Sequence, residues 1–327
     1  MIRFTWLQFR AQALVVAGAL AALAVAAAGL LHRDDGTARL WLGVLVLVTP
    51  ALIGMFWGAP LVAREFEEGT FRLAWTQSVT RARWMTVKLA VVGLASMTAA
   101  GLLSVVVTWW CGPLDHADLN QFATFDQRGI APLGYAAFAF TLGVLAGALL
   151  RRTLPAMFVT LAVFVAVRLA EFSWLRPRLL HPVLVNLALN PATTGYGQQG
   201  TLSVLFSSPT LMPNPPNLPN TWITSLGVVN AHGDGLTTRA LNSACPGIGQ
   251  GRGGGGGSGG GLGHTRAPQS VVTRMQDCVA KIGTTYHEAV AYQPAGRYWP
   301  LQWYELAIFL GAALILAWAC LWRIRRA

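Results

Sequence analysis

The sequence predicts an all-α integral membrane protein with six transmembrane helices. Of its 327 residues, 54% are hydrophobic and only 11% are charged, whereas a typical soluble domain carries roughly 25% charged residues. Several apolar runs exceed the roughly 20 residues that a helix needs to cross the hydrocarbon core. These runs are continuously apolar and do not alternate, so a closed membrane β-barrel is excluded as the fold.

The apolar runs divide the chain into three regions. Residues 1–175 hold five spans, residues 176–300 form one long loop, and residues 301–327 hold the sixth span with a basic tail. In the fourth span, Gly143 and Gly147 have a spacing that favours close packing inside the bundle over a dimer seam. The expected spans are 12–31, 40–62, 86–110, 132–150, 153–175 and 301–322.

Loop charges predict which side of the membrane each connection faces. Six spans put both termini on one side, and the short segments of that side hold most bases, such as Arg151 and Arg152 between the fourth and fifth spans. The two short loops on the other side hold more acids than bases. This asymmetry places both termini in the cytoplasm. Topology and anionic lipid headgroups explain the net charge of +11, so we expect no nucleic-acid partner.

The region 176–300 is expected to be a long, largely disordered extracellular loop. It contains a Pro-rich stretch at 208–220 and a Gly tract at 249–263, and such compositions are typical of flexible linkers. Cys245 and Cys278 share this loop on the oxidising side of the membrane, where a disulfide can persist. Two unpaired thiols are the alternative.

Sequence motifs for catalysis and metal binding are missing from the chain. Its six histidines include no pair at metal-ligand spacing, and the Gly tract lacks the Lys-Ser/Thr ending of a phosphate-binding loop. No nucleophile signature of the GxSxG type occurs. We therefore expect no metal site, no bound cofactor and no ATP hydrolysis by this chain itself.

Arg168 and Glu171 stand out as charged residues inside the fifth span. They are three residues apart and so share one face of a helix. Charge inside a membrane is costly unless it faces the bundle interior, which makes the pair a functional candidate. A structural ion pair and the lining of a substrate pathway both remain open. Glu305, near the start of the sixth span, is a weaker candidate of the same kind.

The connection between the second and third spans, residues 63–88, is the most informative segment. Arg64 to Glu68 continues the second span as an acidic helical extension, which Gly69 can end in a left-handed cap. A short helix is then expected to expose Phe71, Leu73 and Trp75, and Ser78 or Thr80 to cap the next helix. Such a helix either docks a partner or rests in the lipid headgroups.

This connection resembles the first cytoplasmic loop of ABC-2-type transporter permeases, most closely those of high-GC Gram-positive bacteria. In that loop an Arg-Glu-x-Glu-x-Gly-Thr run precedes a coupling helix, a Thr-x-x-(Ser/Thr)-Arg turn and a lysine at the third span. Two features depart from the pattern: Phe66 stands where a charged residue is common, and the loop 176–300 is far longer. The matching positions are Arg64, Glu65, Glu67, Gly69, Thr70, Thr76, Thr80, Arg81 and Lys88.

The resemblance implies the permease subunit of an ABC exporter in a bacterial plasma membrane. A separate ATPase subunit would bind ATP and Mg and push on the coupling helix, and a second permease, identical or homologous, would complete the pathway. The rival functions are a non-transporting sensor or assembly component that docks an ATPase, and a polytopic membrane enzyme. The residues expected to couple to the ATPase are Arg64, Glu65, Glu67, Gly69, Thr70, Phe71, Leu73, Trp75 and Arg81.

Overall fold

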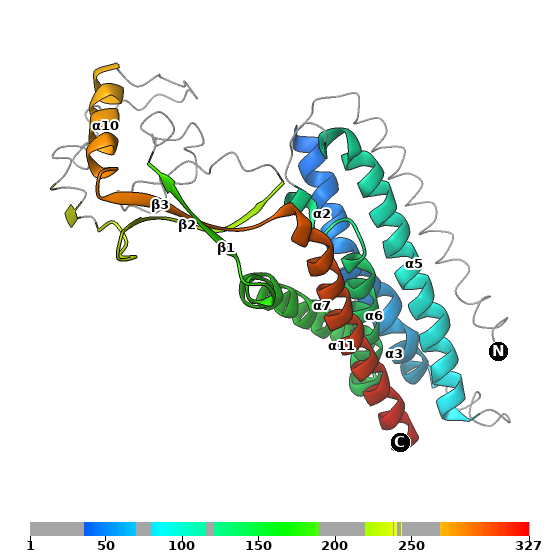
Figure 1. Cartoon of the computed structure of the whole chain (residues 1–327). Coiled ribbons are helices and arrows are strands. Elements are labelled where there is room, and N and C mark those ends of the chain that lie inside the picture. The colour runs from blue at the N-terminus through cyan, green and yellow to red at the C-terminus, as the bar shows by residue number, and fades with distance from the viewer. Residues whose placement is uncertain are drawn as a thin grey trace, which may run out of the picture. The chain divides into compact units, whose positions relative to one another are not determined.

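The structure is a computed structural model that describes residues 36–69, 80–115, 121–189, 220–237, 239–240, 243 and 269–326. It divides into two compact units (Figure 1). The helix unit combines Met1–His181 with Ala295–Ala327, and the sheet unit is Pro182–Pro294. Each unit is described by itself below.

The helix unit contains five helices that are long and apolar enough to cross a membrane. They correspond to five of the six expected spans, and the expected span at 12–31 lies outside the described residues. The third helix begins five residues earlier and ends five residues later than the expected 86–110 span. The elements are α2 (Gly36–Ile53), η1 (Gly54–Gly58), α3 (Ala59–Glu67), α5 (Arg81–Asp115), η2 (Gln121–Thr124), α6 (Ala131–Leu150), α7 (Thr153–Ala170), η3 (Glu171–Leu175), α8 (Arg176–Leu179), η5 (Ala295–Arg297) and α11 (Tyr298–Arg326).

Helix α6 is the centre of this unit. It packs against α2, η1, α3, α5, α7 and α11, and α11 runs beside it (Figure 1). The span formed by α6 is 72% buried, whereas the span that contains α7 is only 17% buried. Helix α7 therefore packs through one face, against α6, α3, η1 and α2, and leaves its other faces exposed within the unit.

Glycines allow α6 to cross η1 and α3 at backbone contact. A Cβ on Gly54 would lie 2.6 Å from the carbonyl oxygen of Ala139, and one on Gly147 would lie 2.6 Å from that of Ala59. Real side chains do not fit into such a gap, so these positions accept only hydrogen. The close approach of small residues is the usual means of packing helices in lipid.

Two π-helical turns lie within the long helices. Each turn is followed by one residue and then by a proline. The amide of Ala59, before Pro60, donates to the carbonyl of Gly54, and the amide of Arg176, before Pro177, donates to that of Glu171. A proline ring clashes with the carbonyl four residues earlier. A wider turn moves that carbonyl away from the ring, so the helix continues without a break.

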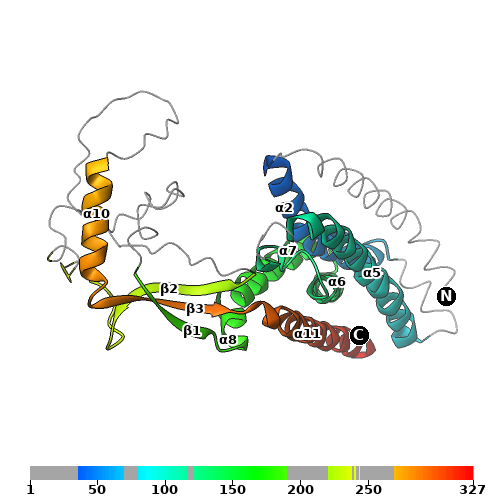
Figure 2. The same cartoon turned by 45° about the horizontal axis from the view of Figure 1, so that its top comes forward.

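The sheet unit is a three-stranded antiparallel sheet with one helix. Strands β1 (Val183–Ala188), β2 (Trp222–Asn230) and β3 (Tyr286–Gln293) pair in the order β1-β3-β2, with β3 in the middle (Figure 2). Helix α10 (Gln269–Ile282) contributes to the core of the unit. That core consists of Leu189, Val228, Cys278, Val279 and Ile282.

The sheet corrects the expectation of an all-α chain, and it corrects the expectation of a largely disordered loop for the described part of 176–300. The strands have six to nine residues, and β1 pairs with β3 about a hundred residues later in the chain. The Gly- and Pro-rich composition of the intervening sequence gave no sign of this pairing. Residues 190–219 and 244–268 lie outside the described residues.

Candidate functional site

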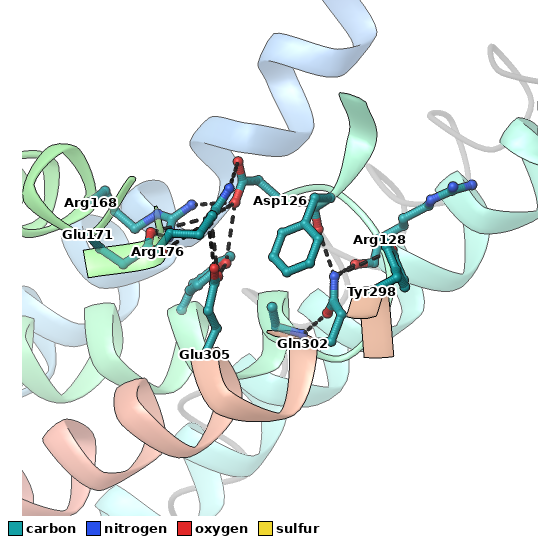
Figure 3. A network of polar contacts seen from close by, with 11 residues as sticks. Asp126, Arg128, Arg168, Glu171, Arg176, Tyr298, Gln302 and Glu305 are labelled. Atoms are coloured by element: carbon teal, nitrogen blue, oxygen red, sulfur yellow. Dashed lines mark hydrogen bonds and ion pairs between the residues drawn. The ribbon is translucent and has the colours of Figure 1, made fainter. Parts of the chain in front are cut away.

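A network of charged side chains joins α7, α8, α11 and the loop before α6 (Figure 3). Arg168 and Glu171, predicted to share a helix face, form an ion pair. The Nε atom of Arg176 lies 3.0 Å from Glu171 Oε1 and 2.6 Å from Glu305 Oε1. Asp126 forms ion pairs with both arginines, at 2.8 Å from the Nη2 atom of Arg168. We call Asp126, Tyr135, Arg168, Glu171, Arg176 and Glu305 the ionic network.

The centre of the ionic network is buried, Asp126 and Arg168 are partly exposed, and the members satisfy one another. The side chains of Glu171, Glu305 and Arg176 are 3%, 0% and 5% exposed, and the Tyr135 hydroxyl donates to Glu305. The Arg168 guanidinium lies 3.8 Å from the centre of the Tyr135 ring. Removing one partner from such a pairing leaves an uncompensated buried charge, at a cost of about 3–5 kcal/mol. The network therefore holds together α7, α8, α11 and the loop before α6, which contribute its residues.

The π turn η3 brings Arg176 into the network. Residues five apart lie about 140° apart around a regular α-helix, so Glu171 and Arg176 would point in different directions. A π-helical turn takes about one residue more, and residues five apart then lie closer to the same face. Sequence reasoning treated residue 176 as the start of a loop and missed this arginine. The signal that was present is Pro177 directly after it.

Asp126 lies outside the spans and anchors the loop before α6. Burial favours the neutral carboxyl, but the guanidiniums of Arg176 and Arg168 outweigh burial and hold the pKa of Asp126 below its ordinary value. The carboxylate is therefore ionised at neutral pH, in the form that binds both arginines. Asp126 was counted only as an outer-loop charge in the sequence, because its partners are more than 40 residues away.

A second polar contact at this end caps α6 from another helix. Ile130, the N-cap residue, makes no capping bond through its side chain, so the first amides of α6 need a partner. Gln302 of α11 supplies it: its Oε1 accepts from the amides of Ile130 and Ala131 at 3.0 and 2.8 Å. Gly129, with φ of +81°, leaves the space for this amide group, because a Cβ there would lie 2.7 Å from Gln302 Oε1.

At the opposite end of the helix unit, the acidic residues that close α3 bind three different partners. Glu65 forms an ion pair with Lys88 of α5. Glu67 accepts from the amide and the hydroxyl of Thr153, the first residue of α7, at 2.9 and 2.7 Å.

Glu68 stays on its own helix, where it accepts from Arg64 at 2.8 Å in an exposed pair. Glu65, Glu67 and Glu68 are alike in the sequence but have different roles in the structure. Helices α5 and α7 are both tied to the end of α3, and Glu68 contributes to neither tie.

Part of the predicted coupling segment is described. Gly69 has φ of +69°, in the left-handed region that the sequence predicts for it. The Thr80 hydroxyl accepts from the amide of Arg83 at 3.3 Å, as expected for the cap of the next helix. Arg81 is the first residue of α5. The side chain of Arg81 and the residues Thr70, Phe71, Leu73 and Trp75 lie outside the described part of the chain.

The two cysteines of the predicted disulfide differ in what the structure describes. Cys278 is buried in the core of the sheet unit and is disulfide-bonded. Cys245 lies outside the described residues.

Comparison with known proteins gives a family match within the helical part of the chain. The sequence profile described as "ABC-2 membrane transporter related" matches residues 30–176, a little under half of the chain. The match runs from α2 to the first residue of α8 and includes Glu67, Lys88, Asp126 and Arg176, but not α11. It confirms the resemblance to ABC-2-type permeases. Neither the comparison with curated proteins nor that with solved structures gives a match.

Proposed function

We propose that the chain is the permease subunit of an ABC exporter, because residues 30–176 match the ABC-2 membrane transporter related profile. The family match is the observation that carries this proposal. Five helices of membrane-spanning length support it. ATP and Mg would bind to a separate ATPase subunit, and this chain would contribute the pathway through the membrane.

The segment between α3 and α5 is the proposed ATPase-docking site. Its ends are anchored in the bundle, because Glu65 and Lys88 form an ion pair and Glu67 binds Thr153. A force applied between two anchored ends is passed to several spans at once. Phe71, Leu73 and Trp75 would supply the apolar contact surface for the ATPase.

The membrane orientation follows from the same proposal. The end of the bundle that holds Glu67 and Thr153 would face the cytoplasm of a bacterial cell, with both termini on that side. The sheet unit would lie outside, and the disulfide bond of Cys278 supports an oxidising compartment there. We propose Cys245 as its partner. A second permease, identical or homologous, would complete the pathway.

Co-purification with an ATPase tests the proposal directly. The full chain would be purified from its host, either unchanged or with Phe71, Leu73 and Trp75 all replaced by Glu, and any co-purifying ATPase with Walker motifs would be identified by mass spectrometry. The unchanged chain should retain the ATPase and the triple variant should lose it. Leu184→Glu is the matched control, since Leu184 is a 73% exposed apolar residue of the sheet unit.

Two outcomes would contradict the proposal. One is an ATPase that does not bind the unchanged chain, and the other is equal binding by the triple variant. Binding of the ATPase without any transport activity would favour the non-transporting alternative.

A further inference from the structure

Helix α7 packs through one narrow face and makes polar contacts at its two ends. Its buried residues are Ala156, Thr160 and Phe164, which are four apart and form one narrow stripe. Ala156 packs against Ala59 and Ala146 near the start of the helix, and Phe164 packs against Phe138 further along it. A helix held in this way can shift as a rigid rod if the contacts at its ends allow it.

The contact at the start of α7 is a cap supplied by another helix. Arg152, its N-cap residue, makes no capping bond through its side chain, whereas the Glu67 carboxylate accepts two hydrogen bonds from Thr153. A carboxylate at this position also interacts favourably with the helix dipole. The guanidinium of Arg151 lies 5.6 Å from the Phe66 ring centre, which adds a second contact between α3 and the same turn.

The contact at the other end of α7 is the ionic network. Arg168 lies in the last turn of α7, and Glu171 and Arg176 follow directly. These residues bind Asp126 before α6 and Glu305 of α11. With 18 residues, α7 separates its two end contacts by about 27 Å.

We propose that Glu67 and Thr153 are positioning residues that pass a displacement of α3 along α7 to the ionic network. The end of α3 leads directly into the proposed docking segment, so movement there reaches the start of α7 through the carboxylate. Because α7 is one continuous helix that packs through a single narrow face, we expect the displacement to arrive at Arg168 and Glu171. The inference rests on the proposed function only for the origin of the displacement.

Hydrogen exchange of the full chain in lipid nanodiscs, without ATPase, tests the inference. Glu67→Gln keeps the size of the side chain but removes its charge and one acceptor. We expect exchange about two- to fivefold faster both at 153–160 and at the distant loop 121–131, since the lost contact is charge-assisted but exposed, and solvent weakens it. Thr153→Ala should act in the same direction, and Thr153→Ser should restore both regions.

Glu68→Gln is the matched control. Glu68 is adjacent in sequence but binds only Arg64 among the described residues, so exchange at both regions should stay unchanged. Faster exchange confined to 153–160 would overturn the inference, because Glu67 would then be a local cap. An equal rise at 121–131 in Glu68→Gln would also overturn it, since the effect would be a general loosening of α3.

Coupling between two sites is reciprocal, so a change in the ionic network should also affect the start of α7. This gives a second measurement. Glu305→Gln, which weakens the network at α11, should speed exchange at 153–160. Failure of the ATPase to bind would leave these results unaffected, so the inference and the proposed function can fail separately.

Discussion

Arg176 is the residue on which the ionic network depends most, because it binds three carboxylates. Arg176→Met should leave those carboxylates with Arg168 alone and lower the free energy of unfolding by about 3–5 kcal/mol. Thermal unfolding of the purified protein in lipid or detergent measures this loss. Arg178→Met is the control: Arg178 is exposed and contacts Trp174, so we expect a loss below about 1 kcal/mol. Equal losses in the two variants would contradict the account of the network.

Glu288 gives a prediction of pH dependence in the sheet unit. It is buried in β3, and its Oε1 atom has no hydrogen-bond partner in the described structure. Burial raises the pKa of the Glu288 carboxyl above its ordinary value of 4.5. The folded unit thus binds the proton more tightly than the unfolded chain does. Its stability should fall as the pH rises from about 4.5 through the raised pKa.

Hydrogen exchange of β3, corrected for intrinsic rates, measures this dependence at pH 5 and pH 8. Protection of residues 286–293 should be lower at pH 8 in the unchanged protein. Glu288→Gln should remove most of the difference, whereas Asp277→Asn, an exposed position on α10, should not. The same pH dependence in both variants would mean that another group is responsible.

Sequence alone identified some residues of the network and not others, for a clear reason. Arg168, Glu171 and Glu305 were found because charge inside an apolar span is conspicuous. Arg176 and Asp126 were not, because the first depends on a π turn and the second lies in a polar loop. The amide cap from Gln302 had an indirect signal: Ile130 is a poor N-cap residue, so a partner from elsewhere was required.

At the scale of elements, the crossing of α6 with η1 and α3 determines how closely the bundle packs. A Cβ on Gly143 would overlap the carbonyl oxygen of Gly54 and lie 2.8 Å from the amide nitrogen of Ala59. Gly143→Ala should therefore separate the helices and cost about 1–3 kcal/mol.

Thermal unfolding of the Gly143→Ala variant and a control checks this crossing. Gly311→Ala on α11 is the control, because a Cβ at Gly311 has nothing within 4 Å, and its effect should be within about 0.5 kcal/mol. The packing account fails if Gly143→Ala is as mild as Gly311→Ala.

The elements also show where sequence reasoning reaches its limit. Helical spans are predicted well because a run of about 20 apolar residues is rare outside membrane helices. The strands of the sheet unit were missed because they pair across long stretches of chain. Strand pairing of that range depends on partners that a local pattern does not contain.

At the scale of the whole molecule, the proposed orientation makes a labelling prediction. Cysteine would be introduced at Leu184 or at Arg152, both exposed positions, without reducing the protein. A membrane-impermeant thiol reagent should label Leu184→Cys in intact cells but reach Arg152→Cys only after permeabilisation. The native thiols Cys111 and Cys320 are buried and should contribute little. The reverse pattern would invert the topology.

The central claim is that this chain forms the pathway while a separate subunit supplies the energy. ATP hydrolysis in proteoliposomes tests it most directly, with the purified chain alone, the ATPase that co-purifies with it alone, and the two together. We predict no hydrolysis by the chain alone and a complex that hydrolyses ATP at a rate altered by replacing Phe71, Leu73 and Trp75 with Glu. Hydrolysis by the chain alone would contradict the claim. So would an ATPase whose hydrolysis rate is the same with and without the chain.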